Sequence, residues 1–226
     1  MNKKFNITGI SFLILYVLIA ISVITASGWV GVLDLYFIEA MQSKVTDSGA
    51  SAVALLTDIG GTEGIVILTL LVTVSLFIKK MYVAGFWFGM TVLISPGILV
   101  YLMKLLIDRD RPEYLRLAAE TSQSFPSGHS TASTVFFGLS GVILILLARR
   151  LWKRIIIAVM TLTIILFVMA SRIYLGVHFP TDVLAGFSFG AATVLLSISL
   201  YHIARPRFQG WLQSKDITDK SPSLFQ

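Results

Sequence analysis

The chain has 226 residues, of which 56% are hydrophobic and only 13% are charged. This charged fraction is about half that of an average soluble domain, so the composition indicates a membrane protein. The absence of cysteine excludes disulfides and cysteine-based metal or redox sites. The net charge of +6 lies in short clusters beside apolar runs, and we therefore expect the lipid bilayer, and no nucleic acid, as a partner.

Six apolar runs are long enough to cross a bilayer. The first follows Lys3 and Lys4 and extends for about 20 residues, which is longer than the apolar region of a signal peptide, so we interpret it as a retained helix. Only helices satisfy the backbone hydrogen bonds of such runs in lipid. The predicted fold class is therefore all-α, a polytopic membrane protein with six transmembrane helices. The predicted spans are 7–28, 63–79, 82–107, 130–148, 154–172 and 181–204.

The connection between the first two spans contains a second helical pattern. Residues 31–45 carry apolar side chains at helical spacing, which predicts an amphipathic helix lying in the membrane interface. This helical outer loop either caps the bundle or takes part in lipid entry. The apolar side chains of its predicted face are Leu33, Tyr36, Phe37, Ala40 and Met41.

Glycine and proline mark two interruptions along the next part of the chain. The pair Gly60-Gly61 predicts a break before the second span. The triplet Ser95-Pro96-Gly97 lies inside the third span and predicts a kink, which serves either helix packing or substrate access.

The charges of the connections predict an orientation. By alternation, one side of the membrane receives twelve basic residues and two acidic ones, a net charge of +10. The other side receives six basic and ten acidic residues, a net charge of −4. The positive-inside rule therefore places both termini in the cytoplasm. We expect a single membrane domain over 1–208, followed by a polar, mobile cytoplasmic tail over 209–226.

Residues with phosphate chemistry collect at span ends on the opposite, outer side. Lys104 and Arg111 are seven residues apart, so they share one helix face if the third helix continues that far. Ser127, Gly128 and His129 open the fourth span, where free backbone N–H groups favour anions. The remaining candidates are Arg172 at the end of the fifth span, His178 in the next loop and Asp182 in the first turn of the sixth span.

These side chains suit a phosphate ester. The three cations match phosphoryl oxygens, and arginine can bind two oxygens at once. An imidazole held by a carboxylate, as His178 by Asp182, is a good nucleophile, and His129 can protonate a leaving oxygen. By contrast, we interpret five charged residues as part of a solvated loop: Asp108, Arg109, Asp110, Glu113 and Arg116. His202, at the cytoplasmic end of the last span, is interpreted as structural.

Three strings carry a family resemblance: Lys104-x6-Arg111-Pro112, Pro126-Ser127-Gly128-His129 and Ser171-Arg172-x5-His178-x3-Asp182. Together they resemble the signature of the type 2 phosphatidic acid phosphatase superfamily, and every signature position is matched. The resemblance implies that His178 attacks phosphorus and forms a phosphohistidine, that Asp182 orients it, and that His129 acts as the acid. It also implies that no metal or other cofactor is needed. The implied phosphate-binding residues are Lys104, Arg111, Ser127, Gly128 and Arg172.

The resemblance predicts a lipid phosphatase of the bacterial plasma membrane with its site on the extracytoplasmic face. Substrate candidates are undecaprenyl pyrophosphate, phosphatidylglycerol phosphate and phosphatidic acid. Two other functions remain open: a lipid phosphotransferase that uses the same site with an acceptor other than water, and a lipid-binding or lipid-translocating bundle. The sequence also leaves the oligomeric state open.

Overall fold

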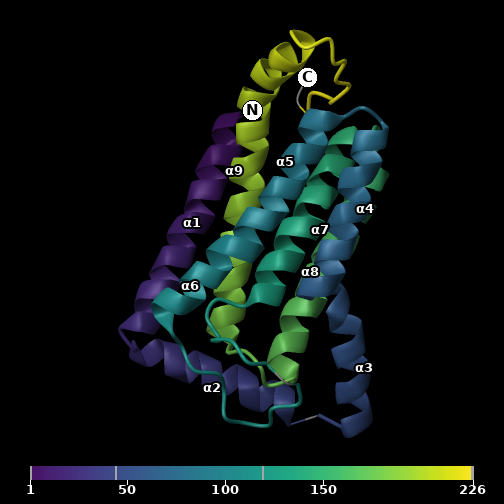
Figure 1. Ribbon diagram of the computed structural model, residues 1–226. Coiled ribbons are helices and arrows are strands. Elements are labelled where there is room, and N and C mark those ends of the chain that lie inside the picture. The colour runs from purple at the N-terminus through teal and green to yellow at the C-terminus, as the bar shows by residue number, and fades with distance from the viewer. Residues whose placement is uncertain (1, 44, 119, 225–226) are drawn as a thin grey trace.

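The computed structural model describes residues 2–43, 45–118 and 120–224, and these residues form helices joined by short turns and one long connection (Figure 1). No strand occurs among them. The elements are α1 (Asn2–Ile24), α2 (Gly28–Gln42), α3 (Asp47–Thr57), the 3₁₀ turn η1 (Asp58–Gly60), α4 (Thr62–Ile78), α5 (Tyr82–Val92), the π-helical segment η2 (Leu93–Leu99), α6 (Val100–Ile107), α7 (Gly128–Leu147), α8 (Leu151–Tyr174) and α9 (Pro180–Gln213).

Six helical stretches are long and apolar enough to cross a membrane, which confirms the predicted fold class. They are Lys3–Ile24, Ser48–Ile78, Tyr82–Ile107, Gly128–Leu147, Leu151–Tyr174 and Pro180–Gln213. The second stretch begins well before the predicted residue 63, because α3 and η1 precede α4. Thr46 starts α3 by accepting a hydrogen bond from the Gly49 N–H at 3.2 Å. The predicted break at Gly60-Gly61 corresponds to η1 and the start of α4.

Helix α9 lies at the centre of the bundle, between α1, α5 and α7 (Figure 1). The start of α7 approaches it closely. A Cβ atom at Gly186 would lie 2.7 Å from the Ser127 carbonyl oxygen, so only glycine allows this contact. The backbone N–H of Ser127 donates to the Asp182 carbonyl oxygen at 3.1 Å. This contact fixes the beginnings of α7 and α9 against each other.

The predicted interfacial helix forms as α2, which crosses the end of the bundle beneath α8 and α9 (Figure 1). Its buried face differs from the predicted one. Val30, Asp34 and Ile38 face the bundle, whereas Tyr36 is 67% exposed and Phe37 also points outward. Of the predicted apolar residues, Tyr36 and Phe37 are thus exposed, whereas Met41 packs against the core around Ile38, and an acidic residue, Asp34, lies on the buried side. The helix caps the bundle, as one of the two interpretations proposed.

The Ser95-Pro96-Gly97 triplet falls within the π-helical segment η2, so the predicted distortion occurs there. Proline lacks the N–H that a regular helix needs, and a wide turn accommodates it. The Ser95 and Thr193 hydroxyls share a hydrogen bond of 3.0 Å. This bond joins the wide turn to α9, which favours a packing role for the distortion.

The C-terminal segment differs from the predicted tail in two ways. The predicted boundary at residue 208 lies inside α9, which continues to Gln213. Beyond the helix, the described residues fold back to the start of α5. The Asp219 carboxylate accepts a hydrogen bond from the Val83 N–H at 3.1 Å, and the Ser221 hydroxyl accepts one from the Ala84 N–H at 2.9 Å.

These two bonds satisfy backbone donors in the first turn of α5, which have no partner within that helix. Partial burial acts to raise the pKa of Asp219, but the hydrogen bonds from Gln209, the Val83 N–H and Ser221 together outweigh it and keep the pKa below the ordinary value. Leu224 is buried in the core beside α5 and α9. Residues 219–224 thus cap a helix instead of extending away from the bundle.

Candidate functional site

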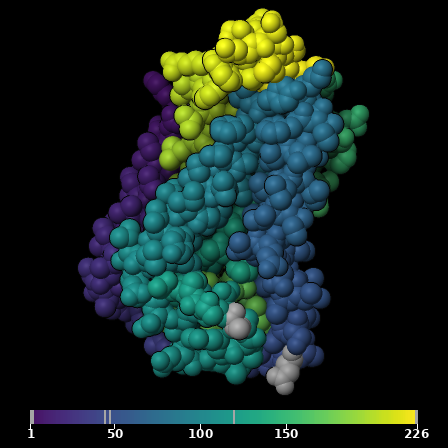
Figure 2. Space-filling view, viewed as in Figure 1, coloured from purple at the N-terminus to yellow at the C-terminus, as the bar shows by residue number. Residues whose placement is uncertain are grey.

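The predicted site residues meet at the end of the bundle opposite the two termini, where α6 ends, α7 begins, α8 ends and α9 begins (Figure 1). The connection over residues 108–127 covers this end. Figure 2 shows a recess between that connection and the segments preceding and forming α4. The eight predicted residues are Lys104, Arg111, Ser127, Gly128, His129, Arg172, His178 and Asp182.

Arg111 reaches the site by a different route from the one expected. The helix does not continue from Lys104 to Arg111, because α6 ends at Ile107 and Asp108 adopts a left-handed conformation with φ of 47°. Arg111 instead lies in the connection, where its Nη1 donates to the Val177 carbonyl oxygen at 2.6 Å. The same Nη1 lies 3.4 Å from His178 Nε2. The connection therefore brings Arg111 against the histidine.

Two arginines converge on one carboxylate. Arg172 Nη2 lies 2.5 Å from one oxygen of Glu120, and Arg111 Nη2 lies 3.6 Å from the other. The Nε of Arg172 is buried and has no hydrogen-bond partner among the described residues. Both guanidinium groups are therefore arranged around an anionic group with two oxygens, and Glu120 supplies that group here.

Lys104 adds a third positive charge at the last turn of α6. Its ammonium donates to the Ser122 hydroxyl and to the Gln123 carbonyl oxygen. The charges of Lys104, Arg111 and Arg172 all act on both His129 and His178. The three predicted cations and the two predicted histidines thus form one electrostatic cluster.

The start of α7 has the geometry of an anion-binding helix end. The Ser127 hydroxyl accepts hydrogen bonds from the Ser130 N–H at 3.3 Å and the Ser130 hydroxyl at 3.0 Å, so it caps the helix. An added Cβ at Gly128 would meet no atom within 4 Å. Packing within the protein therefore does not require glycine there, and the space beside its backbone can admit a ligand.

His129 lies on the first turn of α7, facing the turn before α4. A Cβ atom at Gly61 would lie 3.0 Å from His129 Nε2, so the ring approaches the backbone of that turn. The second span thereby forms part of the wall around His129, although sequence reasoning assigned no site residue to it.

His178 and Asp182 are neighbours, as predicted, but the contact is loose. His178 Nδ1 lies 3.6 Å from Asp182 Oδ2, beyond the length of an ordinary hydrogen bond. Burial, together with the positive charges of Arg111 and Lys104, lowers the pKa of His178 well below its ordinary value. The imidazole is therefore neutral at physiological pH, which is the form a nucleophile requires.

The prediction of a solvated loop is wrong for Arg109. Its guanidinium lies 2.5 Å from Asp182 Oδ1 and 2.7 Å from Asp34 Oδ2, and it stacks 4.0 Å above the Phe179 ring. Asp34 also accepts hydrogen bonds from the N–H and hydroxyl of Thr181, each at 2.9 Å. A buried carboxylate–guanidinium–carboxylate bridge thus connects α2 to the predicted catalytic carboxylate. Burial raises the pKa of Asp34 despite these partners.

Sequence reasoning missed Asp34 and Glu120 as well as the partners of Arg109. One signal for Asp34 was available: it lies four residues from both Val30 and Ile38, so it shares a helix face with two apolar side chains. A charged side chain on the buried face of a helix requires a partner of opposite charge. No comparable pattern marks Glu120, since it lies in an irregular connection.

The fold and this cluster define a polytopic membrane protein with a cationic site for an oxyanion and a buried histidine beside it. Residues 84–206, more than half of the chain, match the family described as the PAP2 superfamily. The chain therefore belongs to the PAP2 superfamily, which confirms the predicted resemblance.

Relatives of established name include phosphatidylglycerophosphatase B of Bacillus subtilis (strain 168), which is 38% identical over 108 residues, or 46% of this chain and 53% of that protein. The undecaprenyl-diphosphatase of Sulfolobus acidocaldarius is 33% identical over 89 residues, 39% of each protein. The chain thus spans about half the length, or less, of these curated relatives.

A solved structure matches over a larger share of the fold. The crystal structure of the first transmembrane PAP2-type phosphatidylglycerolphosphate phosphatase from Bacillus subtilis superposes with a TM-score of 0.76 at 26% sequence identity. The match covers 85% of this chain and 95% of that chain. Most of the six-helix arrangement is therefore shared.

Proposed function

We propose that this protein hydrolyses a phosphomonoester or pyrophosphate group of a membrane lipid. The observation that carries the proposal is the convergence of Arg111 and Arg172 on one carboxylate, with Arg111 also beside His178 Nε2. A carboxylate and a phosphoryl group present similar oxygen pairs to arginine. A phosphoryl group in place of the Glu120 carboxylate would lie beside the imidazole.

The proposed reaction has two steps. In the first, His178 Nε2 forms a bond to phosphorus, the bond to the leaving oxygen breaks, and His129 gives that oxygen a proton. In the second, water attacks the phosphohistidine, His129 takes a proton from the water, and inorganic phosphate leaves. Asp182 orients His178 from the Nδ1 side.

The remaining predicted residues would hold the phosphoryl group. Lys104, Arg111 and Arg172 would stabilise the charge on its oxygens, and Ser127 and Gly128 would contribute hydrogen bonds from the start of α7. Three cations can supply the charge stabilisation that a metal ion provides in other phosphatases, and we therefore propose that no metal is needed.

We further propose that both termini lie in the cytoplasm and that the site opens to the extracytoplasmic face of a bacterial plasma membrane. The charge difference between the two ends of the bundle supports this orientation. The site would then act on lipid head groups in the outer leaflet. Undecaprenyl pyrophosphate, phosphatidylglycerol phosphate and phosphatidic acid are the proposed substrates.

Phosphate release from these three lipids tests the proposal directly. We expect purified protein in detergent to release inorganic phosphate from at least one of them, with kcat/KM ranking the substrates, and to keep its rate in the presence of EDTA. A parallel reaction with a glycerol or sugar acceptor should not divert the phosphate. The absence of phosphate release from all three lipids would contradict the proposed function, and loss of activity in EDTA would contradict the metal independence.

The position of Glu120 gives a further prediction. If the Glu120 carboxylate occupies the place of a phosphoryl group, it competes with phosphate for the two arginines. Glu120→Gln should then strengthen inhibition by inorganic phosphate and lower its Ki by about five- to tenfold, because a neutral amide competes less well for the arginines. Glu113→Gln, which removes the same charge from an exposed position in the same connection, is the matched control. A raised Ki together with a lowered melting temperature would instead identify Glu120 as a brace that holds the arginines.

A further inference from the structure

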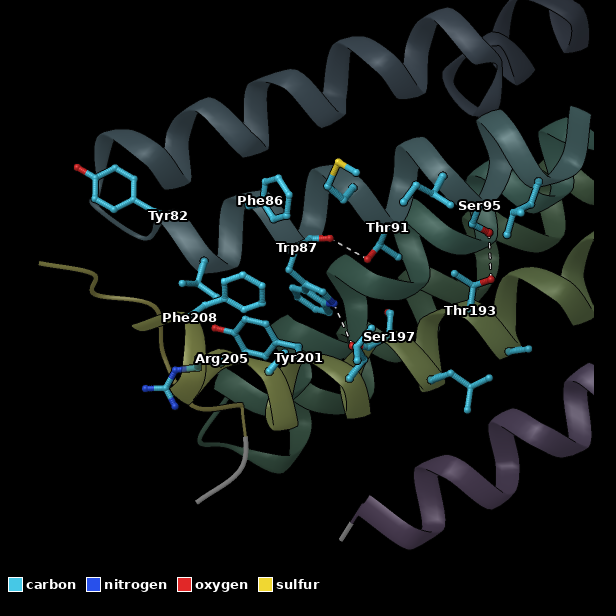
Figure 3. A pocket seen from close by; sticks show the side chains of 18 of the residues that line it. Tyr82, Phe86, Trp87, Thr91, Ser95, Thr193, Ser197, Tyr201, Arg205 and Phe208 are labelled. Carbon is cyan, nitrogen blue, oxygen red and sulfur yellow. Dashed lines mark hydrogen bonds between the residues drawn. The ribbon is translucent and has the colours of Figure 1, made fainter. Parts of the chain in front are cut away.

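A long groove runs along α9 between α5 and α1, on the part of the bundle that carries the termini (Figure 3). It encloses about 790 Å³. Phe86, Trp87 and Met90 of α5 form one wall, Leu13 of α1 forms part of the opposite side, and Leu196 and Leu200 belong to the α9 surface between them. None of the proposed phosphatase residues lines it.

The apolar part of the groove is about as long as the hydrocarbon region of one bilayer leaflet. Its apolar part follows α9 from Phe189 to Tyr201, a rise of about 18 Å, and half of a hydrocarbon core measures about 15 Å. The groove then continues for about three turns to Leu212. Its inner end lies about two turns of α9 from Asp182, so most of the groove lies in the half of the bundle away from the proposed phosphatase site. These dimensions fit one lipid that inserts from the end carrying the termini.

The polar groups along the groove are already hydrogen-bonded within the protein. The Trp87 indole N–H donates to the Ser197 carbonyl oxygen at 2.9 Å, and the Thr91 hydroxyl donates to the Trp87 carbonyl oxygen at 2.7 Å (Figure 3). The Ser95 and Thr193 hydroxyls bond to each other. The walls therefore present hydrocarbon to an occupant, which suits an acyl chain and not a polar molecule.

The mouth of the groove, by contrast, is polar and carries a positive charge. Arg205 lines it, and its Nε donates to the Ser221 carbonyl oxygen at 3.0 Å, which fixes the guanidinium there. Its two terminal nitrogens form no hydrogen bond within the described residues. Tyr82 and Trp211 flank the same end, and such aromatic side chains are typical of the head-group level. A fixed cation at this level favours an anionic head group.

We propose that this groove is a binding site for one anionic phospholipid, with an acyl chain along α5 and α9 and its head group at Arg205. The site is separate from the proposed phosphatase centre and does not depend on it. Under the proposed orientation, the lipid comes from the cytoplasmic leaflet. The lipid would fill the space between α5 and α9 that protein side chains leave open.

The test measures lipid retention by native mass spectrometry after reconstitution into nanodiscs of equal phosphatidylglycerol and phosphatidylcholine. We expect the wild-type chain to retain one phosphatidylglycerol. Ala204→Phe, which places a ring in the groove, should abolish retention, whereas Ile203→Phe, outside the groove and lipid-facing, should not. Arg205→Gln should lower the preference for phosphatidylglycerol about fivefold, and Arg207→Gln, with the same charge change at an exposed position, should preserve it.

Two results would overturn the proposal: equal lipid retention by Ala204→Phe and Ile203→Phe, or equal loss of selectivity in Arg205→Gln and Arg207→Gln. If Ala204→Phe fails to fold, the comparison of Arg205→Gln with Arg207→Gln still tests the proposal. Because the readout is binding of a lipid without a terminal phosphate, failure of the proposed phosphatase activity leaves the result interpretable.

Discussion

Replacing His178 with alanine is expected to abolish phosphate release from every lipid substrate. His178 is 1% exposed, and its Nε2 lies 3.4 Å from Arg111 Nη1, so it is buried beside a cation that can hold a phosphoryl oxygen. Removal of a nucleophile in comparable hydrolases costs roughly 10³- to 10⁶-fold in kcat. The measurement is phosphate release in detergent by purified protein, followed over hours to detect a residual rate.

His202→Ala is the matched control, since His202 lies at the far end of α9 and outside the proposed site. We expect wild-type activity from it. Both variants should show wild-type melting temperatures within a few degrees, which separates loss of chemistry from loss of fold. Phosphate release by His178→Ala at the wild-type rate would refute the assignment of the nucleophile.

Replacing Arg109 with alanine should destabilise the fold and also abolish the proposed phosphatase activity. The substitution leaves Asp34 and Asp182, which are 2% and 0% exposed, without their shared cation. Breaking a buried ion pair in this way costs about 3–5 kcal/mol. Thermal unfolding in detergent should therefore show a marked decrease in melting temperature, and Asp182 should lose the contact that fixes its carboxylate beside His178.

A double variant makes this prediction specific. In Arg109→Ala/Asp34→Asn, one of the two stranded carboxylates is neutral, so part of the lost stability should return. Lowering the pH should likewise restore part of the stability that Arg109→Ala loses. Because burial raises the pKa of Asp34, the folded variant favours its protonated form, and the stability deficit should shrink as pH falls through that pKa. Arg116→Ala, in the same connection but exposed, should behave like the wild type. If Arg109→Ala and Arg116→Ala change the melting temperature equally, the bridge from Arg109 to Asp34 and Asp182 does not stabilise the fold.

The sequence allowed prediction of those features that depend on local pattern. The length of the apolar runs predicted six spans, because a bilayer imposes a minimum length on every helix that crosses it. The positions of Lys104, His129 and Arg172 near span ends then predicted that they meet on one side of the membrane. That placement follows from alternation along the chain and needs no knowledge of how the helices pack.

The features that were missed depend on contacts between distant segments. Arg109 binds Asp34, which lies in a helix 75 residues earlier, and no local pattern relates the two. The helix after Lys104 was expected to continue to Arg111, but its left-handed end at Asp108 directs the chain across the site instead. The C-terminal segment has a polar composition, so its docking against α5 could be found only from the three-dimensional structure.

That docked segment also bears on the order in which the protein is made. Residues 219–224 are synthesised after all six membrane helices, yet they satisfy backbone donors at the start of the third. While the sixth helix is still leaving the ribosome, the N–H groups of Val83 and Ala84 must rely on water or lipid head groups. The third membrane helix therefore acquires its final N-terminal cap only when synthesis has passed the last span, which makes completion of the bundle a late event in translation.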